Sequence, residues 1–201
     1  MHIEVREPVR ILPDSKRRFS DREYLAFCRA NPELKVERTA EGEIVIVAPA
    51  SAESSYWEAD VTRQLANWAE GDGRGKAFSP SAQFFLPDGS ARSPDAAWIS
   101  NAPLAQLSRA EKRSFPYLVP DFVIEVRSPS DRLKKAQAKM EQWIANGVKL
   151  LWLIDGDHET VYIYRRGEPV EERWGIHQKL AGEGPVKGFV LNLRPIWQGL
   201  G

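Results

Sequence analysis

The sequence contains a single cysteine, Cys28, among 201 residues. One cysteine excludes an intrachain disulfide and any metal site that needs several thiolates. No apolar run approaches the ~20 residues needed to cross a bilayer, and the first 20 residues lack the apolar core of a signal peptide. We therefore expect a cytoplasmic protein, in a reducing compartment and without a membrane partner.

The sequence also lacks net charge, since 28 basic side chains balance 28 acidic ones. A nucleic-acid partner would therefore need a local basic patch, because no global field attracts it. The glycine-rich fingerprints of dinucleotide and phosphate binding are absent, as is the Gly-x-Ser-x-Gly elbow of serine hydrolases. His2, His158 and His177 do not have the paired spacing of a zinc site.

Length and composition suit one globular domain, because 201 residues of which 42% are hydrophobic can bury one substantial core. Residues 1–19 show no clear hydrophobic period and are predicted to form an N-terminal arm. Residues 20–201 are predicted to form a single domain.

The first half of that domain reads as a helix, a hairpin and a long second helix. Ser20 and Glu23 form a capping box, and Asn31-Pro32 ends the first helix. A hairpin is predicted around Glu41-Gly42. The other expected elements are hairpin strands at 34–38 and 43–47, a helix at 52–70, strands at 76–78, 83–86 and 96–100, the last two flanking a turn at 87–89, and a short helix near 108–114.

The second half contains a strand–helix–strand unit. Residues 122–126 form an apolar run between two prolines, which is typical of a central strand covered on both faces. A helix capped by Ser130 or Asp131 runs to Asn146, and a strand at 148–154 follows, so the two strands should be parallel. Later strands are expected at 160–165, 170–173 and 189–193. The pattern predicts an α/β domain (α+β mixed sheet) with helices on its faces.

Three charged residues stand in unusual surroundings. Glu125 lies inside the apolar run, where a carboxylate is costly unless it is paired. It forms a salt bridge, with Arg127 or with the next helix, or it is a metal ligand. Asp95 precedes an apolar strand and either caps a turn or serves the same site. Lys139, at the edge of an apolar helix stripe, either extends to solvent or is functional.

Together these segments resemble a known family. Ser93-Pro94-Asp95, the run from Glu125 to Asp131, Lys139 and the segment 146–155 are similar to the Uma-two family of restriction-endonuclease-like proteins, within the PD-(D/E)XK nuclease superfamily. The likeness covers roughly residues 32–193. It implies a restriction-endonuclease-like core with flanking helices and a magnesium site at one edge of the sheet.

The resemblance also implies roles for individual residues. Asp95 matches the Asp of the Pro-Asp motif, and Glu125 matches the acid of the second motif. That motif expects a lysine where this sequence has Arg127, and Lys139 on the following helix stands in for it. Glu53 matches an extra acidic residue of many superfamily members. Arginine stays protonated and cannot take a proton from water, so Arg127 would bind substrate phosphate, as would Arg132.

This residue set suits metal-assisted phosphodiester hydrolysis. Mg²⁺ prefers hard oxygen ligands, which Asp95, Glu125 and the Val126 carbonyl would provide; Mn²⁺ can substitute. The ion would polarise the scissile phosphate and activate water, and Lys139 would stabilise the developing charge. The prediction is a Mg²⁺-dependent endonuclease acting on nucleic acid, with DNA as the expected substrate, and a homodimer would suit cleavage of two strands.

Two other functions stay open. Arg127 in the lysine position and the zero net charge favour a catalytically inactive nuclease-fold module that binds nucleic acid or protein. A metal hydrolase acting on small phosphodiesters is the third alternative.

Overall fold

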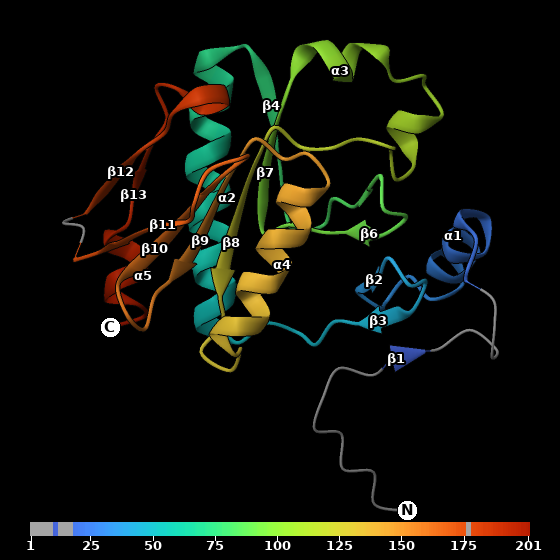
Figure 1. Ribbon diagram of the computed structural model, residues 1–201, viewed down its shortest axis with the longest axis horizontal. Helices are drawn as coiled ribbons and strands as arrows, with labels where there is room; N and C mark the ends of the chain where they lie inside the picture. The colour runs from blue at the N-terminus through green and yellow to red at the C-terminus, as the bar shows by residue number, and fades with distance from the viewer. Residues whose placement is uncertain (1–9, 12–17, 176–177) are drawn as a thin grey trace, which may run out of the picture.

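The computed structural model describes residues 10–11, 18–175 and 178–201. Its centre is a six-stranded sheet in the order β11-β10-β9-β8-β7-β4 (Figure 1). Only β8 and β9 are parallel among these neighbours, so the sheet is mixed, as the sequence predicts. Its strands are β4 (Gly75–Phe78), β7 (Ala96–Ser100), β8 (Phe122–Arg127), β9 (Leu150–Asp155), β10 (Thr160–Arg165) and β11 (Glu171–Trp174).

The predicted crossover joins β8 to β9 through α4 (Leu133–Ala145). The helix begins later than predicted, since its N-cap is Arg132 and not Ser130 or Asp131. The preceding turn is closed by a bond from the Asp131 N–H to the Ser128 carbonyl, and the Asp131 carbonyl accepts from Arg127. These two bonds hold the turn before α4, so the helix starts only after it.

Two helices cover opposite faces of the sheet (Figure 1): α2 (Ala52–Asp72) on one and α4 on the other. Side chains of β8 alternate between them, as expected for a strand. Ile124 packs in one cluster with Trp57 of α2, whereas Val123 packs in the other with Trp143 of α4. Because β8 is buried on both faces, every polar side chain on it must find a partner inside the protein.

A second sheet lies beside this core, in the order β1-β3-β2-β6-β5, and α1 packs on it (Figure 1). The predicted capping box of Ser20 and Glu23 begins α1, and the predicted hairpin is formed by β2 and β3. The elements are β1 (Arg10–Ile11), α1 (Asp21–Ala30), β2 (Val36–Arg38), β3 (Ile44–Ile46), β5 (Phe84–Phe85) and β6 (Ala91–Arg92).

One hairpin assignment was wrong. The turn at 87–89 is flanked by β5 and β6 of the small sheet, whereas β7 pairs with β4 and β8 of the large one. Ser93 and Pro94 separate β6 from β7, and proline cannot donate to a ladder. The short segment 93–95 therefore connects the two sheets and places Asp95 directly before β7.

The remaining elements are short. The expected helix near 108–114 is a single 3₁₀ turn, and the prediction missed α3, β12 and α5. The bounds of all the remaining short elements, whether predicted or missed, are α3 (Asn101–Gln106), η1 (Glu111–Arg113), β12 (Lys179–Ala181), η2 (Gly184–Val186), β13 (Val190–Asn192) and α5 (Arg194–Gln198).

Most of the predicted arm, 1–19, lies outside the described residues, apart from the β1 strand and residues 18–19. Within the described part of the chain, no helix is both long enough and apolar enough to span a bilayer.

Candidate active site

Asp95 and Glu125 meet at the end of the ladder between β7 and β8. Ala96 pairs with Ile124, so the next position along the antiparallel pair sets Asp95 opposite Glu125. Asp95 Oδ2 accepts a hydrogen bond of 2.8 Å from the Val126 N–H. The N–H and C=O of one strand residue point to the same side of the strand, so the Val126 carbonyl also faces the side on which Asp95 lies.

Lys139 reaches the same place from α4. Its Nζ lies 2.8 Å from Glu125 Oε2, and Trp143 Nε1 donates to Glu125 Oε1 at 3.0 Å. Lys139 and Trp143 are four residues apart and therefore lie on the same helix face. Of the two salt bridges considered for Glu125, the one to the helix is formed, and Arg127 pairs elsewhere.

A further carboxylate, which the sequence reading missed, belongs to Glu37 on β2 of the small sheet. Glu37 accepts hydrogen bonds from Arg92 Nη1 at 2.8 Å and from the Ser93 N–H at 3.1 Å. Its Oε1 lies 3.9 Å from Lys139 Nζ. In a hairpin strand, a single acid flanked by Val36 and Arg38 is usually solvent-facing, so no local signal identified it; β2 is instead buried throughout.

On α2, Glu58 is an acid that interacts electrostatically with Asp95. Thr62 donates to the Asp95 carbonyl at 3.2 Å, and Glu58 lies one turn earlier on the same helix face. Glu53 was predicted to be the extra acidic residue of the site. It is nine residues before Thr62 and therefore lies roughly 180° around the helix from it. Its carboxylate lies against Gly199, and among the described residues no hydrogen bond or ion pair joins it to Asp95.

Burial dominates the electrostatics of the two central carboxyls. It raises the pKa of Glu125 to about 8, with Asp95 and Glu37 adding to the rise and Lys139 opposing it. Burial likewise raises the pKa of Asp95. Like charges placed this close cannot both ionise easily, so burial and mutual repulsion both favour a proton retained on this pair.

The other two groups are held in their charged forms. Burial alone would lower the pKa of Lys139, but Glu125, Glu37 and Asp95 raise it above its ordinary value. Burial alone would raise the pKa of Glu37, but Lys139 and Arg92 hold it below its ordinary value. Burial, with Asp95, also raises the pKa of Glu58.

Arg127 is not directed at this group. Its guanidinium forms an ion pair of 2.8 Å with Asp155 and one of 3.0 Å with Asp157, and its side chain is 6% exposed. Nη1 donates to the Asp131 carbonyl at 2.8 Å. These contacts tie the ends of β8 and β9 to the turn before α4. Arg132, in contrast, is exposed immediately before that helix.

The residues present fit a magnesium ion. The described residues contain no preformed group of three His, Cys, Asp or Glu side chains that could hold a metal. Mg²⁺, however, is commonly bound by one or two carboxylates with waters and substrate phosphate completing its shell. Asp95, Glu125 and the Val126 carbonyl match that donor set, provided Lys139 moves away from the Glu125 carboxylate, both oxygens of which it contacts.

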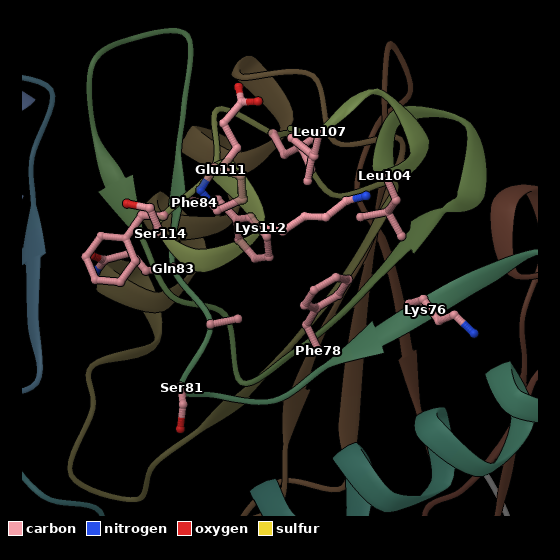
Figure 2. A pocket seen from close by; sticks show the side chains of 14 residues that line it. Lys76, Phe78, Ser81, Gln83, Phe84, Leu104, Leu107, Glu111, Lys112 and Ser114 are labelled. Atoms are coloured by element: carbon pink, nitrogen blue, oxygen red, sulfur yellow. The ribbon is translucent and has the colours of Figure 1, made fainter. Parts of the chain in front are cut away.

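A hollow lies elsewhere, beneath α3 and η1 (Figure 2). Its volume is about 430 Å³, and its lining is mostly apolar, with Phe78 and Phe84 prominent. None of the carboxylates described above lines it. Gln83 connects the two regions, because it lines the hollow while its Nε2 lies 3.4 Å from Ser93 Oγ. The acid–lysine group, not this hollow, has the chemistry of a hydrolytic site.

The mixed sheet with α2 and α4 on its two faces defines a restriction-endonuclease-like α/β fold. A model of the Uma2 family, described as "Putative restriction endonuclease", matches residues 21–192. The chain belongs to this family, which confirms the resemblance noted from its motifs.

Solved structures agree on the fold. The crystal structure of a "putative nuclease belonging to DUF820" from Anabaena variabilis ATCC 29413 aligns with a TM-score of 0.66 and 20% identity, over 83% of this chain and 91% of that one. A chain of the cryoEM structure of a DrdV–DNA complex aligns with a TM-score of 0.37 and 15% identity, over 58% of this chain and 10% of that one, too weakly to support an argument. No curated protein matches the chain.

Proposed function

We propose that this protein is a Mg²⁺-dependent endonuclease that hydrolyses phosphodiester bonds in nucleic acid, with DNA as its substrate. The observation that carries the proposal is the meeting of Asp95, Glu125 and Lys139 at one end of β8. Two carboxylates and one ammonium are the groups that metal-assisted phosphodiester hydrolysis requires. Membership of a restriction-endonuclease family supports the same reaction class.

In this proposal Asp95, Glu125 and the Val126 carbonyl hold Mg²⁺, or Mn²⁺ in its place. A bound ion supplies Lewis-acid polarisation of the phosphate and a lowered pKa of water. Asp95 is fixed for this task on both sides, since the Val126 N–H binds its carboxylate and Thr62 binds its carbonyl. Glu58 adds negative charge from α2 and takes the place proposed for Glu53.

Lys139 acts as a fixed positive charge. Because the surrounding carboxylates keep it protonated, it stabilises negative charge that develops on the phosphate and orients the attacking water by donating to it. Arg132 is better placed than Arg127 to bind a substrate phosphate, because Arg127 is already held by Asp155 and Asp157.

The test combines metal titration with cleavage. Calorimetry with Mg²⁺ and Mn²⁺ is performed on the wild type, Asp95→Asn and Glu125→Gln, and the same samples are incubated with supercoiled plasmid, single-stranded DNA and RNA. We expect metal binding and plasmid cleavage in the wild type and loss of both in the two variants. Asp121→Asn is the matched control, because Asp121 is a buried acid next to the opposite end of β8. A wild type that binds no metal and cuts no substrate contradicts the proposal.

A second candidate is a binding module that keeps the nuclease fold. The contact between Lys139 and both Glu125 oxygens favours it, because this ion pair satisfies the site without a metal. Such a module would bind nucleic acid equally well with EDTA present and after Asp95→Asn. The same titrations therefore separate the two candidates.

A further inference from the structure

Lys139 lies between carboxylates from two different sheets. Glu125 of the large sheet is 2.8 Å from its Nζ, and Glu37 of the small sheet is 3.9 Å away. We propose that Glu37 is the positioning residue for Lys139: it receives the ammonium when a divalent cation takes Glu125. This inference rests on the proposed function, because it assumes that Glu125 binds a cation.

Glu37 is a fixed acceptor. Its side chain is 8% exposed, so it cannot turn into solvent. One oxygen accepts from the Ser93 N–H and the other from Arg92. Both bonds orient the carboxylate, so the charge that Lys139 faces stays in place whatever happens at Glu125.

Lys139 needs such an acceptor because both Glu125 oxygens are engaged. Lys139 Nζ lies 2.8 Å from each of them, and Oε1 also accepts from Trp143 Nε1. A cation that binds Glu125 must therefore displace the ammonium, and a largely buried ammonium without a counter-ion is costly. Asp95, the other nearby carboxylate, is itself a proposed metal ligand. Glu37 is the nearby acid that the cation does not claim.

The movement required is small. The two distances differ by about 1 Å, which rotation about the terminal bonds of the lysine side chain covers without moving α4. Arg92 bonds Glu37 and also donates to Gln142 Oε1 of α4 at 2.7 Å. Arg92 thus couples the small sheet to the helix that carries Lys139 and keeps donor and acceptor at a fixed separation.

Ser93 lies between the Glu37 carboxylate and the Lys139 ammonium. Its N–H donates to Glu37, and its carbonyl lies 3.5 Å from Lys139 Nζ. Two residues later the chain reaches Asp95. An ammonium that moves from Glu125 toward Glu37 stays beside this peptide and therefore beside the reacting phosphate of the proposed site.

The test is a double-mutant cycle read by Mg²⁺ calorimetry, without substrate. Glu37→Gln keeps an acceptor for Ser93 and Arg92 but removes the charge. We expect it to weaken Mg²⁺ binding about fivefold in the wild type, the size of coupling seen between contacting residues. In a Lys139→Met background the same change should leave Mg²⁺ affinity unchanged, because no ammonium needs a second partner. Asp121→Asn should leave affinity unchanged in both backgrounds.

Equal weakening in both backgrounds would overturn the inference, since Glu37 would then act only by attracting the cation over distance. No weakening in either background would overturn it too. If the wild type binds no Mg²⁺, the proposed function and this inference fall together. Should Glu37→Gln not fold, Glu37→Asp replaces it: this variant keeps the charge but shortens its reach, with an expected loss of about twofold that again disappears in Lys139→Met.

Discussion

The Lys139 ammonium lies 2.8 Å from the Glu125 carboxylate, which joins α4 to the strand that precedes it. The salt-bridge interpretation of Glu125 is therefore confirmed, and under the proposed function the metal-ligand interpretation describes a second state of the same group. The lysine is hydrogen-bonded to the buried acid in this structure, and in the proposed metal-bound state the same lysine would face the phosphate.

Lys139→Met should separate metal binding from catalysis. Removing the positive charge frees Glu125, so Mg²⁺ should bind several-fold more tightly by calorimetry. Cleavage should fall by about 10²- to 10³-fold, the usual effect of removing one group that stabilises transition-state charge. Lys149→Met is the control, because Lys149 pairs with Asp121 near the other end of β8. Unchanged cleavage in Lys139→Met would show that the lysine is only structural.

The raised pKa of Glu125 makes stability fall with pH. In the folded protein its pKa is about 8, against an ordinary value of 4.5. Between these values the native state holds a proton that the unfolded state has released, so this group lowers the free energy of unfolding as pH rises from about 4.5 to 8. Glu125→Gln should flatten that decline in urea denaturation series at pH 5 to 8.

Asp121→Asn is the control for this series. Although burial opposes it, Lys149 and Ser100 hold the pKa of Asp121 below its ordinary value. The stabilisation from that acid is therefore lost only as pH falls through the acid range, below the window used. A Glu125→Gln slope equal to that of the wild type would argue against a retained proton.

Arg127→Ala should be among the most destabilising substitutions. It leaves Asp155 buried without its main partner, and breaking a buried ion pair costs about 3–5 kcal/mol. Urea denaturation measures the loss. Arg132→Ala, at an exposed site, should change the free energy of unfolding by less than about 0.5 kcal/mol. If Arg132 binds a phosphate, the substitution should instead weaken nucleic-acid binding and reduce the slope of log affinity against log salt concentration by about 1, the value for one lost phosphate contact.

Glu58 and Glu53 form a matched pair on one helix. Glu58→Gln should weaken Mg²⁺ binding about threefold, because it removes charge coupled to Asp95. Glu53→Gln should not change Mg²⁺ affinity, because its carboxylate lies against Gly199 on the other side of α2. Calorimetry on the two variants checks this. A larger effect at Glu53 than at Glu58 would restore the assignment made from the sequence.

The elements that the sequence predicts well are those set by local chemistry. The capping box of Ser20 and Glu23, the long helix α2 and the β8–α4–β9 crossover are all present. Each depends on residues close together in the chain, whose propensities and hydrogen bonds do not need the rest of the fold. The strand alternation that puts Glu125 on the same face of β8 as Val123, toward Trp143 of α4, is equally local.

The sequence reading failed where contacts are distant. It assigned β7 to the 87–89 hairpin because nothing in the short β6 segment distinguishes a strand from a connection. It named Glu53 from the family resemblance and did not consider Glu58, because the face of α2 that meets Asp95 is fixed only when Thr62 packs on it.

By itself, then, the sequence determined the family, the crossover and the three charged residues Asp95, Glu125 and Lys139, because these are carried by motifs and by periodicity along the chain. Only the tertiary structure decided their partners. Glu37 and Arg92 are 55 residues apart on neighbouring strands of a second sheet. Their charges reach Lys139 only because the two sheets fold side by side, and burial there fixes which carboxyl keeps its proton. Long-range electrostatics in a desolvated site depends on three-dimensional distance, which no spacing along the chain encodes.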